Sequence, residues 1–137
     1  MHHERQTEFT VYLDDRPGAL AGLLESCTAA GVTVEALAVH THEGKGVTRL
    51  LGTPPEAMRE AMDHLMDAGV GPIVDAEVLT VTLNGRPNAF RDLAAAFAGK
   101  NVNILYGYLA PPVGETPARS ILRVADLDAA EQIVQSL

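Results

Sequence analysis

The sequence predicts an α+β fold made of two tandem βαββαβ units, and two observations carry this prediction. First, residues 10–34 align without a gap with residues 80–104, and eight of the twenty-five aligned positions are identical. Second, each repeat alternates apolar residues of period two, typical of strands, with apolar residues of period 3.6, typical of helices. Similarity at a fixed offset indicates duplication of one structural unit. We therefore expect two units, residues 1–77 and 78–137, each with helices on one face of an antiparallel sheet.

The first repeat contains the complete set of six elements. Phe9, Val11 and Leu13 alternate with polar or small residues, which predicts a half-buried strand. Pro17 suits the first turn of a helix. The other expected elements are a helix that ends at Gly31, strands at 32–40 and 47–52, a second helix, and a strand near 72–77. The second helix is expected to open with a capping box at Thr53-Pro54-Pro55-Glu56. Its buried, methionine-rich stripe is expected at Met58, Ala61, Met62 and Leu65.

The second repeat lacks the last strand of this pattern. Its expected elements are a strand at 78–83, a helix at 87–98, strands at 102–110 and 118–124, and a helix at 127–137. A sheet edge left unpaired in this way invites association with another strand. We expect residues 1–8, the other unit or a second chain to cover it.

Composition excludes several classes of function. The net charge is −8 and the ten basic residues are scattered, which argues against a nucleic-acid surface. No apolar run is long enough to span a bilayer, and the polar start lacks the apolar middle of a secretory signal. Cys27 is the only cysteine, so a disulfide framework is excluded and a cytoplasmic location is expected.

The stretch DDRPGALAGLL at 14–24 has the chemistry of a ligand-binding turn. A helix N-terminus presents unpaired N–H groups and a positive dipole, which suit a carboxylate. Gly18 removes the Cβ that would keep a ligand from the backbone, and Asp14 or Asp15 could accept from an ammonium group. One of these two aspartates is also expected to cap the helix. A diverged copy, NGRPNAFRDLA, follows at 84–94.

These motifs resemble the ACT domain, a ferredoxin-like βαββαβ module. The first copy rests on DDRPGALAGLL and AAGVTVEALAVH, and a more divergent copy rests on RPNAFRDLA and KNVNILYGYL. The resemblance covers nearly the whole chain, with no catalytic domain attached. It implies that the chain binds an amino acid or related small effector between domains paired side by side. No cofactor and no metal are expected.

The resemblance also implies which residues contact the ligand. Asn88 replaces the glycine of the first turn and would crowd a ligand there, so the first repeat is expected to hold the better-formed site. The positions carried over are Asp14, Asp15, Arg16, Pro17, Gly18, Ala19, Thr33 and Val34 in the first repeat, and Asn84, Gly85, Arg86, Pro87, Asn88, Ala89, Asn103 and Ile104 in the second.

The leading hypothesis is a regulatory amino-acid-binding protein, expected to form a homodimer, whose output passes to a partner protein such as a regulated enzyme or stays within the module. A second hypothesis is a trans-acting regulatory subunit, because residues 10–40 also resemble the start of the acetolactate synthase small subunit. An enzyme is not expected, since no nucleophile, base or metal cluster has a recognisable spacing; His40 and His42 lack an evident third ligand. A pairing module without a ligand is the remaining alternative.

Overall fold

The computed structural model describes residues 1–83 and 85–137, which form two compact units. The first unit comprises residues 7–76, and the second comprises residues 1–6 together with residues 77–137. Each unit is described by itself below. None of the helices in the described residues is long and apolar enough to cross a membrane.

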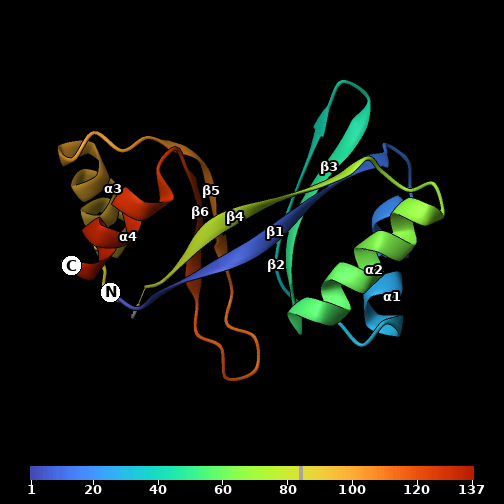
Figure 1. Cartoon of the computed structure of the whole chain (residues 1–137), viewed down its shortest axis with the longest axis horizontal. Helices are drawn as coiled ribbons and strands as arrows, with labels where there is room; N and C mark the ends of the chain where they lie inside the picture. Colours follow the sequence, from blue (N-terminus) through green and yellow to red (C-terminus); the bar gives the residue numbers. More distant parts are fainter. Residues whose placement is uncertain (84) are drawn as a thin grey trace. The chain divides into compact units, whose positions relative to one another are not determined.

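The first unit is a four-stranded antiparallel sheet with two helices against one face (Figure 1). Its sheet order is β2-β3-β1-β4, and the backbone N–H of Tyr12 on β1 donates to the carbonyl of Pro72 just before β4, at 3.0 Å. The elements are β1 (His3–Asp14), α1 (Ala19–Ala29), β2 (Thr33–His42), β3 (Lys45–Thr53), α2 (Pro55–Asp67) and β4 (Ile73–Thr82), of which β1 and β4 extend into the second unit.

The core of the first unit lies between that sheet and its two helices. The predicted stripe of α2 is confirmed, because its four residues are buried. Met66, which directly follows the last of them, is 43% exposed. Leu23 and Cys27 supply the buried face of α1. The helix then ends as predicted, with Gly31 in the left-handed region at φ 78°. These helices therefore meet strand side chains such as Phe9, Val11 and Leu50 in one apolar cluster.

The second unit has the same architecture with a different chain path. Its sheet order is β1-β4-β6-β5, in which β1 contributes only its first residues. Its apolar core joins β4 and β6 to both helices through buried residues such as Leu79, Leu122, Phe97 and Val134. The further elements are α3 (Ala89–Gly99), β5 (Ile104–Ala110), β6 (Arg119–Val124) and α4 (Leu127–Gln135).

The start of the chain supplies the strand that the second repeat lacks. The N–H of Thr82 donates to the carbonyl of His2 at 2.9 Å, and the hydroxyl of Thr80 donates to the carbonyl of Glu4 at 3.3 Å. Arg5 pairs with Asp128 and Glu131 at α4, and these hydrogen bonds raise the pKa of the Arg5 guanidinium above its ordinary value. The predicted open edge is therefore closed by residues 1–6.

Two local predictions are wrong. The separate strands expected at 72–77 and 78–83 are one continuous strand, β4, because the sequence between them contains no turn residue. The capping box is not formed: α2 has Pro54 as its N-cap and no side-chain cap. Thr53 is instead the last residue of β3, where it pairs with Thr33, so sheet pairing overrides the local capping preference. The predicted α+β fold of two ferredoxin-like units is confirmed.

Candidate functional site

The turn between β1 and α1 is exposed and has a left-handed residue at its end. Asp14 ends β1, and the N–H of Arg16 donates to its carbonyl at 2.9 Å. Gly18 is the N-cap of α1 with φ 90° and ψ −16°, a conformation that residues with a Cβ rarely adopt. Asp15 and Pro17 are exposed, and Ala19 is half-buried. The sequence DDRPG thus fixes how the chain enters the helix.

No side chain caps α1. The expectation that Asp14 or Asp15 would do so is wrong, because the glycine at the N-cap brings the chain into the helix with the aspartates one turn away. By contrast, α4 is capped by its own sequence: Asp126 accepts from the N–H of Ala129 at 3.1 Å. The positive end of α1 therefore lacks the side-chain anion that α4 provides for itself.

A pocket of about 250 Å³ lies beside this uncapped turn in the first unit. Its volume is below the roughly 300–1,000 Å³ of sites for drug-sized ligands, so it suits a smaller metabolite. The walls come from the end of β1, one side of α1 and the segment that follows α2. The lining residues are Tyr12, Leu13, Asp14, Arg16, Gly18, Ala19, Gly22, Leu23, Ser26, Leu65, Gly69, Val70 and Gly71.

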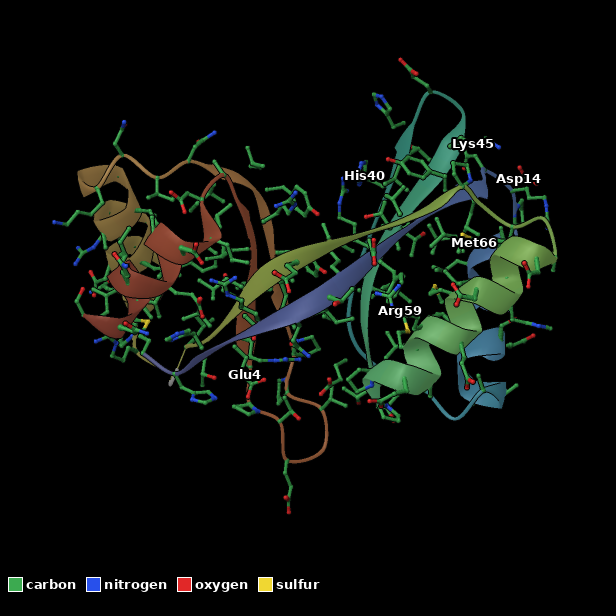
Figure 2. The ribbon with its side chains drawn as sticks, viewed as in Figure 1. Glu4, Asp14, His40, Lys45, Arg59 and Met66 are labelled. Atoms are coloured by element: carbon green, nitrogen blue, oxygen red, sulfur yellow. The ribbon has the colours of Figure 1, made fainter. Side chains whose placement is uncertain are left out.

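Charges of both signs stand at this pocket. The Asp14 carboxylate is 3.2 Å from the Lys45 ammonium and 4.0 Å from Nε of Arg16. Figure 2 shows Asp14 and Lys45 at the same end of the first unit. Asp14 and Arg16 line the pocket, with side chains 68% and 64% exposed. A carboxylate and a guanidinium in this arrangement can accept from an ammonium group and donate to a carboxylate.

Gly22 forms part of the helical wall of the pocket, and packing does not require a glycine there. A Cβ built on Gly22 meets no atom within 4 Å, and its φ is not positive. Glycine inside a helix is about 0.5–1 kcal/mol less favourable than alanine. Its presence therefore lowers stability while it leaves space beside the pocket. A glycine without a packing role in the middle of a helix is a signal that sequence reasoning overlooked.

Gly22→Ala is accordingly expected to raise the free energy of unfolding by about 0.5–1 kcal/mol. The gain comes from helix propensity, since the new methyl group meets open space. Urea denaturation of the wild-type and variant proteins measures the difference. A loss of stability would show that the methyl group strains its surroundings.

Two predicted site residues of the first repeat lie away from this pocket. Thr33 and Val34 begin β2, after the C-terminal end of α1, whereas Gly18 precedes its N-terminal end. The eleven residues of α1 span about 16 Å at 1.5 Å per residue. Val34 packs on the core of the unit, and Thr33 is exposed. Within the first unit, one small ligand therefore does not contact both groups.

The second unit separates its predicted site residues too. Asn103 and Ile104 line a cavity of about 520 Å³ formed with the C-terminal half of α3, and Arg86, Asn88 and Ala89 are not among its lining residues. Asn88 is the uncapped N-cap of α3, at φ −112°, so it does not adopt the left-handed conformation of Gly18. The two turns have therefore diverged in backbone geometry.

The other predicted contacts of the second turn, among the described residues, do not line the cavity that contains Asn103 and Ile104. Arg86 is exposed and lies 3.9 Å from a carboxylate oxygen of Asp92. Gly85 and Pro87 are exposed, and Ala89 is 2% exposed, so its side chain packs inside the unit. The prediction for Asn84 falls outside the described residues.

The described histidines of β2 and the cysteine do not form a metal-binding or catalytic cluster. His40 and His42 are exposed on β2, and no cluster of three metal-ligating side chains occurs in residues 1–83 and 85–137. Cys27 is fully buried, and burial raises the pKa of its thiol. A neutral, enclosed thiol is a weak nucleophile.

Several solved structures have the same fold as this chain. Protein BT0572 from Bacteroides thetaiotaomicron matches with a TM-score of 0.82 at 16% identity, covering 98% of this chain and 89% of that one. The regulatory subunit of aspartate kinase from Thermus thermophilus, in its ligand-free form, matches with a TM-score of 0.68 at 15% identity, covering 99% and 97%.

A third similar structure belongs to a larger enzyme. Aspartokinase III of E. coli, in complex with lysine and aspartate, has a TM-score of 0.56 at 16% identity; the match covers 98% of this chain and 31% of that one. No protein-family model and no curated protein matches this chain by sequence. At such identities the structural likeness establishes the fold alone.

Proposed function

We propose that this protein is a small-molecule-binding regulatory protein whose ligand is an amino acid or a close relative. The observation that carries the proposal is the pocket of about 250 Å³ at the uncapped N-terminus of α1, with Asp14 and Arg16 at its border. The α-ammonium group would pair with Asp14. The α-carboxylate would receive hydrogen bonds from Arg16 and from N–H groups of the first helical turn, where the N–H of Ala19 already donates to the carbonyl of Arg16 at 3.3 Å.

This proposal extends the tandem ACT assignment to both units, with repeats at residues 1–77 and 78–137. It favours the first unit as the binding unit, because the pocket there includes Asp14, Arg16, Gly18 and Ala19 from the predicted turn. A homodimer and a cytoplasmic location remain part of it. Thr33, Val34 and the residues of the second turn remain proposed contacts that the pocket itself does not include.

A second candidate is a regulatory subunit that acts in trans on an amino-acid biosynthetic enzyme. A specific observation favours it: the Thermus thermophilus aspartate kinase regulatory subunit is matched over 97% of its own length, so a chain of this size and fold occurs as a regulatory subunit. The enzyme regulated by the present chain could be an aspartate kinase, an acetolactate synthase or another enzyme of this class. Both candidates share the ligand pocket.

A thermal-shift screen against the twenty amino acids tests the proposed function, and an exposed arginine outside the proposed contacts provides the control. Arg16→Ala is expected to weaken binding about tenfold or more, since a hydrogen bond to a charged group contributes about 1.5–3 kcal/mol. Arg91→Ala, at a 74% exposed position on α3 that is not a proposed contact, is expected to leave binding unchanged. If no amino acid raises the Tm of the wild-type protein, or if both variants bind equally well, the proposal is wrong.

A further inference from the structure

The inner wall of the first-unit pocket differs in chemistry from its border. Asp14 and Arg16 at the border keep most of their side-chain surface in water. The inner wall contains Leu23 and Leu65, which are 3% and 8% exposed, and the half-buried Val70. A ligand that occupies the pocket thus meets charged groups at one end and aliphatic side chains at the other.

We propose that the ligand is an amino acid with a short, uncharged aliphatic side chain. This inference rests on the proposed function, because it specifies the ligand class of the same pocket. The α-ammonium group of the ligand pairs with Asp14, and its α-carboxylate pairs with Arg16. These two are the charged residues among the described residues that line the pocket. A charged ligand side chain would then lose its hydration against leucine and valine without gaining a partner of opposite charge. An aliphatic side chain gains from leaving water at the same place.

The helix beside the pocket limits where that side chain can lie. A volume of about 250 Å³ suits a single amino acid and is below the roughly 300–1,000 Å³ of sites for drug-sized ligands. The space that does exist depends on residues of α1 that carry little or no side chain. Gly18 and Gly22 lie one turn apart on α1, and Ser26 follows one turn further, so the three share the pocket side of the helix. A larger residue at Gly22 would project into the space that the ligand side chain needs.

The second unit does not preserve this wall. Asp92 stands at the position equivalent to Gly22, seventy residues further along the chain, and its carboxylate lies 3.0 Å from a guanidinium nitrogen of Arg91. An aspartate in place of the glycine puts a charge where the first unit is apolar. The aliphatic preference is therefore expected of the first unit alone.

Isothermal titration of the whole chain with a series of amino acids tests this inference. Affinity is expected to rise about fourfold for each added methylene from L-alanine through L-2-aminobutyrate to L-norvaline, which corresponds to ~0.8 kcal/mol per buried methylene. L-valine is expected to bind at least tenfold more tightly than L-threonine, which has nearly the same shape. L-aspartate and L-lysine are expected to give no heat of binding.

Two glycine variants locate the side chain of the ligand. Gly22→Leu is expected to abolish binding of L-valine. Gly99→Leu, at an open position on α3 where a Cβ also meets no atom within 4 Å, is expected to leave binding unchanged. The Tm of each variant without ligand, compared with that of the wild-type protein, shows whether it is folded.

The outcomes separate this inference from the proposed function. If L-threonine, L-aspartate or L-lysine binds as tightly as L-valine and Arg16→Ala still weakens binding, the aliphatic preference is wrong and the proposed function stands. If L-valine binds and folded Gly22→Leu binds it as well as the wild-type protein does, the placement of the ligand side chain beside α1 is wrong. If no amino acid binds the wild-type protein, both proposals are wrong.

Discussion

Phe97→Ala is expected to lower the free energy of unfolding of the second unit by about 3–5 kcal/mol. Phe97 is 1% exposed and belongs to the apolar cluster that joins α3 and α4 to β4 and β6. Removing its ring takes away apolar contacts and leaves a cavity that the surrounding helices and strands fill only in part. Because native domains are stable by only about 5–15 kcal/mol, a loss of this size threatens the unit itself.

Phe90→Ala is the matched control, because it removes the same ring from the exposed side of the same helix. Phe90 is 41% exposed, and its replacement is expected to change stability by no more than about 0.5 kcal/mol. Urea denaturation gives the two free energies, and amide hydrogen exchange shows whether β6 loses protection while β3 of the first unit keeps it. Equal losses in the two variants would contradict the assignment of Phe97 to the core.

Helical periodicity predicted the core because the helices of both units are amphipathic. In α2, Met58, Ala61, Met62 and Leu65 recur at the spacing of one face, and all four are buried. The duplication also predicted geometry at one point. Gly31 and Asn101, seventy residues apart, both have positive φ, at 78° and 58°. Glycine and asparagine are the residues that tolerate this conformation at the end of a helix, so the local sequence was sufficient there.

The strand at the start of the chain could not be predicted from its own residues. Residues 1–6 include charged and polar side chains and lack the apolar alternation of a half-buried strand. They form an edge strand because the backbone of β4 hydrogen-bonds to them, as in the bond from the N–H of Thr82 to the carbonyl of His2. In addition, Arg5 donates hydrogen bonds to Asp128 and Glu131 of α4. Both partners lie more than seventy residues away along the chain, so tertiary contacts decide the conformation of this segment.

The candidate site was only half predictable for a similar reason. The turn from Asp14 to Ala19 stands out in the sequence because an aspartate pair, a proline and a glycine precede an apolar helix. The opposite wall of the pocket, from Leu65 to Gly71, comes from the segment after α2 and has no motif of its own. Thr33 and Val34, which the family resemblance suggested, follow the C-terminal end of α1. Although they are close to this helix in sequence, they do not line the pocket at its N-terminal end.

Gly18→Ala is expected to abolish the stabilisation that the ligand gives to the first unit. At a hundredfold excess over its Kd, a ligand adds about 2.7 kcal/mol, or roughly 5–11 °C at about 2–4 °C per kcal/mol. Alanine is strained at φ 90°, at a cost of roughly 1–2 kcal/mol, so the chain must shift where it enters α1. That shift moves the N–H groups of the first turn away from the carboxylate that they are proposed to bind.

Gly31→Ala separates this effect from general strain, because Gly31 has φ 78° and its Cβ would also meet no atom within 4 Å. It lies at the other end of α1 and does not line the pocket. Both variants are expected to lose a similar amount of stability without ligand, yet only Gly31→Ala is expected to keep the full ligand-induced shift. Differential scanning calorimetry with and without the amino acid measures both quantities. A full shift in Gly18→Ala would mean that the ligand binds without the amides at the start of α1, and the proposed site would have to be abandoned.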